Sequence, residues 1–555
     1  MLDTQKLMRF FLNYIHTSSP LDSNLALKYV SVSAAASMSK EANVIEREAC
    51  LSEDDLLFDS ADVSPTYLKK ALLASNAIDN IGFGKYQKGL FVVAGFGWFA
   101  DNAFPVATSY ILQRLNEVDK VHYPPGRAPY LTLAQNLGLL AGAFVWSLAA
   151  DIIGRRWVFS FTFLFTSVFS IVAGASPNFA AAGTFCALWS FGVGGNLPVD
   201  SAIFLEALPT NKKWLLTVMS VWWSIGQVVT ALISWGLISN YSCEDVTDCH
   251  ASENKGWRYF MFTLGGLSFL MFLARFLFPV YESPAFYLAR GNNARAIETL
   301  DKIARVNGSI NPLNLEELEE IDRTEKHENG EHAEILEDMD GSTDTLNKTR
   351  TSAYAATAKI GENQLLRQRL RKYGSSHVAQ CFSSRRLALS LTLVIFSWGI
   401  IGLAFPLYNA FLPTYLESKV TASNSVYVTY RNALIVAVLG VPGALISGVL
   451  VELRIGRKGT LCASCIMTGI VLFGSTTAKS SNSYLAWTCF FNFFSNIMYG
   501  VLYAYTPEVF PAKIRGTAVG LAASFNRVFG VFAPIIAMYA DLTTSAPIFV
   551  SGALF

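Results

Sequence analysis

Long apolar runs separated by short polar turns constrain this chain more than any other feature. A helix needs about 20 mostly apolar residues to cross the hydrocarbon core of a bilayer. Runs of this length occupy residues 89–112, 129–150, 156–176, 179–207, 214–239, 257–280, 387–412, 426–452, 458–478, 483–507 and 514–540. Only 15% of residues are charged, against roughly 25% in a typical soluble domain. The sequence therefore predicts an all-α membrane protein.

A further apolar segment, SAPIFVSGALF, begins at residue 545, and the chain stops within it. At about 1.5 Å of rise per residue, this segment reaches only part of the way across the hydrocarbon core. We therefore expect a twelfth spanning helix that is truncated.

The runs divide the chain into four parts. We expect residues 1–88 to be a cytosolic and largely disordered tail, and residues 89–280 to form a first six-helix bundle. Residues 281–386 are expected to be a cytosolic loop with short helices and an acidic, disordered stretch. Residues 387–555 would form the second bundle. Lys and Arg favour cytosolic loops, and the segment 281–386 is rich in both, so it and the N-terminus are placed in the cytosol.

A polar step interrupts the apolar pattern twice. After the second run the chain reads SLAADIIGRRWVF, and after the eighth it reads SGVLVELRIGRKGTL. Each copy carries one acid followed by basic residues: Asp151, Arg155 and Arg156 in the first, Glu452, Arg457 and Lys458 in the second. The two acids are 301 positions apart.

A second pair of motifs follows the fourth and tenth runs. FLEALPTNKKW contains Glu206, Pro209 and Lys213, and TPEVFPAKIRG contains Glu508, Pro511 and Arg515. The two glutamates are 302 positions apart. Two unrelated motifs that keep nearly the same offset indicate that six helices were duplicated.

These motifs resemble those of a known transporter family. DIIGRR and GVLVELRIGRK are similar to the signature loops of the major facilitator superfamily, and PEVFPAKIRG and YESPAFYLARG resemble its sugar-porter branch. GFGKYQKGLFVVAGFGWFADNAF and GVGGNLPVDSAIFLEALP are more similar still to fungal members related to the synaptic vesicle glycoprotein 2 group. The resemblance implies two six-helix bundles related by a pseudo-two-fold axis, which rock about a central site.

The duplicated charges have two interpretations. As a cytosolic gate, Asp151, Arg155, Arg156, Glu206, Lys213, Glu452, Arg457, Lys458, Glu508 and Arg515 would form ion pairs that hold the cytosolic side closed. Exposed pairs contribute only ~0–1 kcal/mol each, so a single binding event is able to release such a latch. Alternatively, the basic residues only set the membrane topology.

A few polar residues lie within the apolar runs, where an ionisable group costs at least ~2.5–3.5 kcal/mol. Candidates for substrate binding or proton coupling are Asp101, Asn102, Asp200, Gln227, Tyr408, Asn409, Asn492, Asn496 and Arg527. The alternative is that these residues are structural partners that join helices within the wall. Arg275, at the inner end of the sixth run, is expected only to extend toward the membrane surface.

Cysteine and histidine usage limits the chemistry. Cys243 and Cys249 lie in a loop predicted to face away from the cytosol, where a disulfide is able to form. The six histidines all lie outside the apolar runs, and CxxC at 462–465 lies inside one. We therefore expect no metal site and no cofactor.

The leading functional prediction is a secondary active or facilitative transporter of a small polar organic solute, sugar-like or an organic acid, with or without proton coupling. No Walker loop, HExxH or GxSxG motif occurs, which argues against an ATP-driven pump or an enzyme. The alternative is a membrane sensor that binds a solute and signals through residues 281–386. A net charge of +1 gives no basic field for nucleic acid. We expect a monomer in the plasma membrane or in a vacuolar or vesicular membrane.

Overall fold

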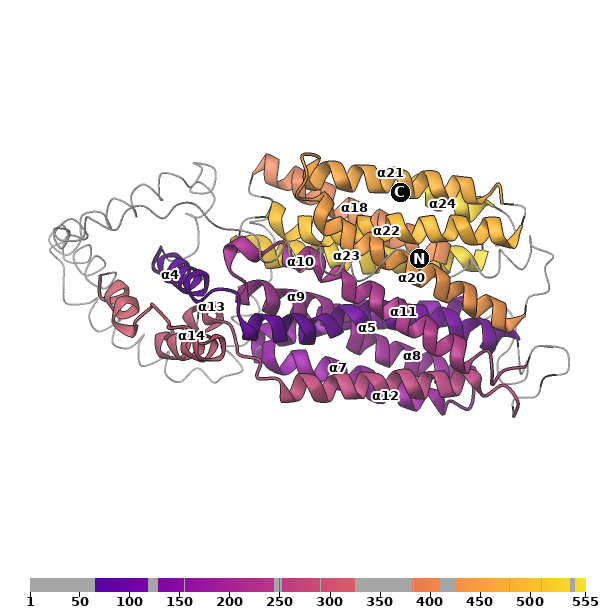
Figure 1. Cartoon of the computed structure of the whole chain (residues 1–555), viewed down its shortest axis with the longest axis horizontal. Coiled ribbons are helices and arrows are strands. Elements are labelled where there is room, and N and C mark those ends of the chain that lie inside the picture. Colours follow the sequence, from indigo (N-terminus) through magenta and orange to yellow (C-terminus); the bar gives the residue numbers. More distant parts are fainter. Residues whose placement is uncertain are drawn as a thin grey trace, which may run out of the picture. The chain divides into compact units, whose positions relative to one another are not determined.

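The computed structural model describes residues 65–117, 128–153, 155–243, 249, 252–289, 291–324, 382, 384–409, 425–478, 480–510, 512–539 and 545–555. Regular structure within these residues is helical (Figure 1). Residues 1–64, and residues 325–340 of the predicted acidic stretch, lie outside them.

The first half of the chain contributes ten labelled elements that the structure describes, and the central segment contributes two. They are α4 (Pro65–Ile81), α5 (Lys85–Glu117), α6 (Ala128–Ile153), α7 (Arg155–Gly174), α8 (Phe179–Gly194), α9 (Asn196–Ala207), the 3-10 helix η1 (Thr210–Lys212), α10 (Leu215–Val218), α11 (Ser220–Leu237), α12 (Gly256–Leu277), α13 (Pro284–Ala289) and α14 (Asn293–Asn307). The second half contributes α18 (Arg385–Asn409), α20 (Val426–Leu450), α21 (Gly456–Ser475), α22 (Ser481–Val509), α23 (Ala512–Tyr539) and α24 (Ala546–Leu554).

Each predicted apolar run coincides with one helix or with two consecutive helices. In the described part of the chain, nine helices are long and apolar enough to cross a membrane. Two runs are interrupted: α8 ends before Gly195 and α9 begins after it, and Met219 separates α10 from α11. Runs 179–207 and 214–239 are thus not single helices, because hydropathy measures apolar length and does not register a local change of backbone direction.

The two halves repeat the same packing. In the first half α6 packs on α8, α5 on α11 and α7 on α12. The second half repeats these contacts as α20 on α22, α18 on α23 and α21 on α24. The halves meet through α11 against α20 (Figure 1). They also meet through α6 against α23. Helices that occupy equivalent positions in the two halves therefore form the interface.

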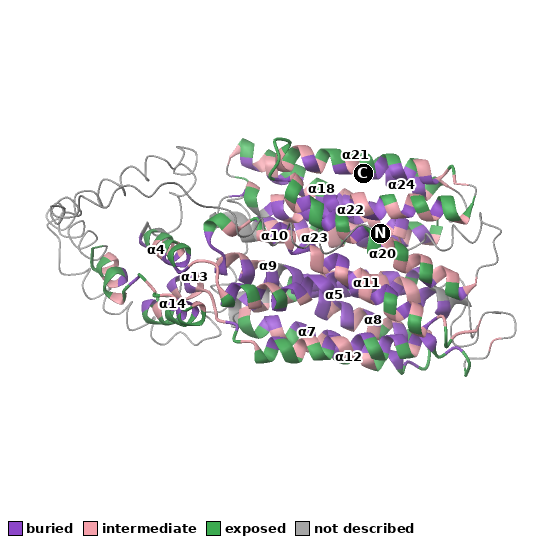
Figure 2. Cartoon of the chain, viewed as in Figure 1, coloured by how far each residue is buried: buried purple, intermediate pink, exposed green. Residues whose placement is uncertain are grey.

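Small residues allow the closest of these contacts. On α6, Gly138 and Gly142 lie one turn apart, and a Cβ atom at either position would lie within about 2.2 Å of a carbonyl oxygen of α8. Such close approach of backbones is a common way to pack helices in lipid, where burial of apolar surface gives little driving force. Large apolar side chains such as Phe144, Phe276 and Phe396 are instead exposed, as expected for lipid contact. Exposed residues are distributed along the outer helices of both halves (Figure 2).

The predicted disordered tail does not extend to residue 88. Residues 65–81 form α4, which packs on α13 and α14. The Lys70 ammonium is nearly inaccessible and lies 2.5 Å from Asp322 Oδ1 and 3.2 Å from Asn293 Oδ1. A buried cation requires such partners, and Lys70 finds them more than 200 residues away. Because its partners are so distant in the chain, local composition did not indicate an ordered helix here.

The orientation predicted from Lys and Arg is testable at two exposed positions. Ser252 precedes α12 at one end of the bundle, and Glu317 belongs to the helical segment 315–324 beyond α14. In intact cells an impermeant maleimide should label Ser252→Cys, whereas Glu317→Cys should react only after permeabilisation. The native cysteines are blocked beforehand. Labelling of both variants from the same side would refute the predicted topology.

Candidate substrate and gating sites

An ion pair joins the two halves of the protein. Asp101 of α5 and Arg527 of α23 lie 2.5 Å apart, measured from Oδ1 to Nη2. Their side chains are 3% and 18% exposed. Since each charge would be costly alone in this environment, the pair stabilises contact between the halves. Two predicted site residues that lie 426 positions apart in the sequence therefore form a direct ion pair.

Aromatic rings surround this pair. Tyr499 and Tyr503 of α22 are its electrostatic neighbours. Tyr503 packs between Trp98 of α5 and Trp398 of α18, with ring centroids 5.0 and 4.6 Å away. The Trp223 ring lies 4.8 Å from that of Tyr499. Sequence reasoning did not select Tyr499, Tyr503, Trp98 or Trp398. Trp98 and Trp398 lie 300 positions apart, close to the offset of 301–302 between the duplicated motifs, and this near-repetition offered a signal.

Amide side chains form a second set of contacts across the interface. Asn492 Nδ2 donates to Gln227 Oε1 at 3.3 Å, and Ser224 Oγ donates to Asn496 Oδ1 at 2.8 Å. Gln227 and Ser224 belong to α11, whereas Asn492 and Asn496 belong to α22. Three of the predicted polar candidates are therefore brought together. In this conformation these side chains form hydrogen bonds with polar groups of neighbouring helices. The alternative interpretation, in which the polar residues only join helices, predicts the same contacts.

Three other candidates bond elsewhere. Asn102 Nδ2 donates to the Trp223 carbonyl at 2.9 Å, and Asn409 Nδ2 donates to the Phe405 carbonyl of its own helix at 3.1 Å. The Tyr408 hydroxyl lies 3.2 Å from that of Tyr484, inside the packed core of the second half. Tyr408 is therefore buried in this conformation, because its face of α18 points into the bundle.

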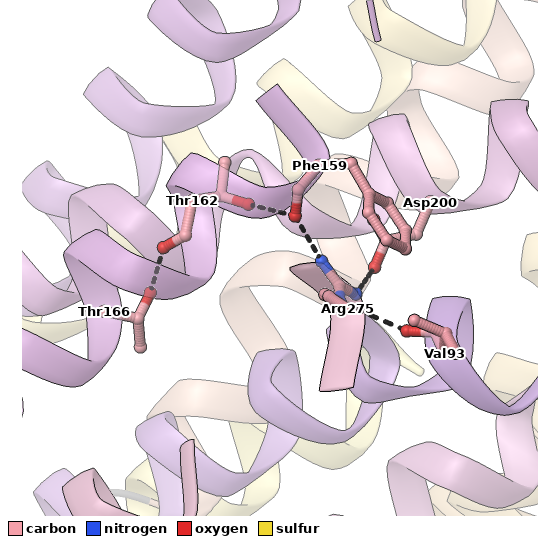
Figure 3. Close-up of polar contacts among 6 residues, drawn as sticks. All are labelled: Val93, Phe159, Thr162, Thr166, Asp200 and Arg275. Carbon is pink, nitrogen blue, oxygen red and sulfur yellow. Dashed lines mark hydrogen bonds and ion pairs between the residues drawn. The ribbon is translucent and has the colours of Figure 1, made fainter. Parts of the chain in front are cut away.

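Asp200 of α9 does not lie at the interface between the halves. It is fully buried within the first half and forms an ion pair with Arg275 of α12, which is also fully buried. Arg275 further donates from Nε to the Val93 carbonyl at 3.1 Å and from Nη1 to the Phe159 carbonyl at 2.7 Å (Figure 3). The expectation that Arg275 extends to the membrane surface is wrong, because these partners hold the side chain inside the bundle.

The duplicated charges form equivalent ion pairs in the two halves. Arg155 pairs with Glu206, and Arg457 pairs with Glu508. Both members of the second pair follow those of the first by 302 positions. Each pair joins helices of one half and does not cross the interface. If these pairs have a gating role, they act by holding helices together within each half and not by joining the two halves.

The remaining gate candidates are less constrained. The Arg156 backbone N–H donates to Glu282 Oε2 at 3.4 Å, and its guanidinium is exposed. Glu452 and Lys458 are exposed and Lys213 is half-buried. The side chains of Asp151 and Arg515 are not among those that the structure describes.

Cys243 and Cys249 form a disulfide with Cα atoms 5.9 Å apart. Arg114, near the end of α5, donates from Nη1 to the Cys243 carbonyl at 3.2 Å, which connects this loop to the first bundle. Among the described residues, no group of three or more His, Cys, Asp or Glu side chains is arranged to hold a metal ion.

Two bundles of equivalent helices, with paired charges and polar side chains at their interface, define a membrane transporter of the two-bundle class. Residues 90–534 match the Major Facilitator Superfamily. The chain belongs to this family and is a multi-pass membrane transport protein, not an enzyme.

Several known proteins are similar to it. An MFS-type transporter of Schizosaccharomyces pombe, PB1E7.08c, is 64% identical over 90% of this chain and 88% of its own length. The MFS siderochrome iron transporter 1 of Ceriporiopsis subvermispora is 44% identical over 95% of this chain and 96% of its own. A synaptic vesicle 2-related protein of Xenopus laevis is 22% identical over 89% of this chain and 80% of its own.

Solved structures share the fold. The proton:xylose symporter XylE of E. coli, bound to 6-bromo-6-deoxy-D-glucose, superposes with a TM-score of 0.60. It is 16% identical, with 84% of this chain and 93% of that chain covered. The predicted family and fold class are confirmed.

Proposed function

We propose that this protein is a secondary transporter that moves a small organic anion by alternating access, with Arg527 as the partner of the anionic group. The observation that carries the proposal is the Asp101–Arg527 pair, which lies between the two halves. A site for alternating access lies at such an interface.

The electrostatics of the pair favour exchange of one anion for another. Arg527 cannot be left without a counter-charge, because an uncompensated buried cation costs several kcal/mol. Asp101 supplies that counter-charge in the conformation described. A carboxylate substrate is able to replace it with the bidentate geometry that guanidinium groups favour, and protonation of Asp101 would lower the cost of the exchange.

The surroundings suit the rest of such a molecule. Trp98, Trp398 and Tyr503 offer flat apolar surfaces beside the pair. Gln227 and Asn492 offer amide donors and acceptors on opposite halves. Ligand sites commonly combine an apolar wall with a few polar groups that fix orientation. Of the two substrate classes predicted from the sequence, a sugar-like solute and an organic acid, we therefore propose the organic acid.

A ferric siderochrome is the second candidate substrate. The specific observation in its favour is the name of the relative from Ceriporiopsis subvermispora and the extent of its similarity, 44% identity over 95% of this chain. Iron in such a chelate would be cargo and would need no metal ligand from the protein.

The test uses the purified full chain in liposomes. Radiolabelled monocarboxylates are compared with their uncharged amides, with neutral sugars and with a ferric siderochrome. We expect saturable uptake of a carboxylate and none of its amide. Arg527→Met should weaken its binding by about tenfold or more, since a charged hydrogen bond contributes roughly 1.5–3 kcal/mol. Arg431→Met is the matched control, because Arg431 is an exposed arginine near the start of α20.

The other outcomes are informative. If only the siderochrome is taken up, the substrate is a ferric chelate and not a small organic anion. Equal uptake of a carboxylate and its amide, unaffected by Arg527→Met, would exclude the anion-binding role. Saturable binding without uptake of any compound would favour the sensor over the transporter. We expect the protein to be monomeric in these preparations.

A further inference from the structure

A buried polar cluster lies inside the first half, away from the interface. Asp200 of α9 and Arg275 of α12 form its ion pair, and the guanidinium packs over the rings of Phe159 and Phe163 of α7 at 4.0 and 4.1 Å. Val93 of α5 supplies one carbonyl acceptor. Figure 3 shows Val93, Phe159 and Asp200 around the Arg275 guanidinium.

The two charges of this pair are not equally satisfied. Arg275 has two backbone carbonyls and two aromatic faces in addition to Asp200. On the carboxylate, Oδ2 bonds to Arg275, whereas Oδ1 is buried without a hydrogen-bond partner. Arg275 thus retains most of its partners if Asp200 becomes neutral. Buried polar atoms are nearly always paired, so an unpaired one calls for an explanation.

Asn196 adds two more unpaired atoms on the same helix. Both its Oδ1 and its Nδ2 are buried without a partner, and the residue is 0% exposed. Asn196 precedes Asp200 by four positions, so the two side chains lie on one face of α9. The structure therefore places an unpaired carboxylate oxygen and an unpaired amide one turn apart on the same helix. A protonated carboxyl group is able to donate a hydrogen bond to the amide oxygen, as well as to accept one from the amide nitrogen.

A pocket lies further along this face of α9, toward its C-terminal end. Ile203 and Ala207 line it and follow Asp200 by three and seven positions, which are the spacings of one helix face. Its wall also carries Arg155, Glu206 and Glu282. Burial raises the pKa of the Glu282 carboxyl, against the opposing effects of Arg156 and Arg155. The pocket thus contains acidic groups able to exchange protons.

We propose that Asp200 is a proton-binding site loaded from this pocket, with Asn196 Oδ1 accepting the hydrogen bond of the protonated carboxyl, directly or through one water. A hydronium ion in the pocket gives its proton to Asp200 Oδ1 and becomes water. The charge of the pair changes from zero to +1, with Arg275 held by its remaining partners. The assignment deepens the proposed function, on which its consequence for transport rests.

The other charged side chains on the surrounding helices either form ion pairs of their own or lie at the helix ends. Asp101 pairs with Arg527, and Arg155 pairs with Glu206. The further charged residues of α5, α7 and α12 lie in the terminal turns of these helices: Lys85, Lys88, Arg114, Glu117, Arg156 and Arg258. Asp200 packs against Gly97, one turn before Asp101 on α5. The charge gained at Asp200 therefore lies one helical turn of α5 from the Asp101–Arg527 pair.

The experiment is infrared difference spectroscopy on the purified full chain in lipid, titrated from pH 9 to pH 5. We expect a protonated-carboxyl band that increases with acidification and shifts in D₂O. It should be present in wild type and in Asp101→Asn, and absent in Asp200→Asn. In Asn196→Leu, which removes the acceptor, its midpoint should fall by about one pH unit.

The Asn196→Leu variant keeps the test decisive if Asp200→Asn does not fold. A titrating band unaffected by either substitution, or no titrating band, would overturn the assignment and leave water as the occupant. A wild-type titration without uptake of any solute would refute the proposed function and retain the proton site. Solute uptake without an Asp200-dependent band would support the proposed function and refute the proton site.

Discussion

Gly97→Ala should strongly destabilise the folded protein. A Cβ atom at position 97 would lie 1.7 Å from Asp200 Oδ2 and 2.9 Å from Arg275 Nη2. The carboxylate cannot yield without leaving the guanidinium, and breaking a buried pair costs about 3–5 kcal/mol. We expect a marked loss of monodisperse protein in detergent and a lower midpoint of thermal unfolding, measured by fluorescence-detected gel filtration after heating.

The control for this prediction is Gly266→Ala in α12. A Cβ atom there meets nothing within 4 Å, and alanine favours a helix by about 1 kcal/mol over glycine. The control should unfold at the wild-type temperature or above it. If Gly97→Ala behaves like Gly266→Ala, then Asp200 does not pack against α5 as described.

The second prediction concerns accumulation of substrate. A carrier that moves one proton with each solute molecule is able to accumulate the solute about tenfold per unit of pH gradient. Asp101→Asn removes the carboxylate beside Arg527, while the amide oxygen still accepts a hydrogen bond from the guanidinium. We expect accumulation to fall to simple equilibration, with exchange of external for internal substrate retained. Both are measured in liposomes with a pH gradient imposed across the membrane.

The matched control is Glu253→Gln, which removes an exposed acid outside the interface. It should leave both accumulation and exchange unchanged. If Asp101→Asn still accumulates substrate in response to the pH gradient, Asp101 serves only as a structural partner of Arg527. If wild type never accumulates substrate, the protein is a facilitative carrier and Asp101 has no coupling role.

The sequence alone determined the membrane class and the two-half plan. Apolar runs of spanning length are local features, and the cost of exposing polar backbone to lipid makes each run helical. The duplicated motifs also indicated that the two halves have equivalent corners. Arg155 pairs with Glu206 in the first half, and Arg457 pairs with Glu508 at the equivalent position of the second. Repetition is visible in sequence because it is a comparison of the chain with itself.

Only the tertiary structure decided which polar residues meet. Asp101 bonds to Arg527, Ser224 to Asn496 and Lys70 to Asp322, across separations of 426, 272 and 252 positions. Asp200 and Asp101 are both acids within apolar runs, yet one lies inside a bundle and the other between bundles. Arg275 is held by partners on α5, α7 and α9, and α4 is ordered by contacts with the central segment. Periodicity and composition describe each helix alone, whereas the partner of a buried charge depends on which helix faces pack together.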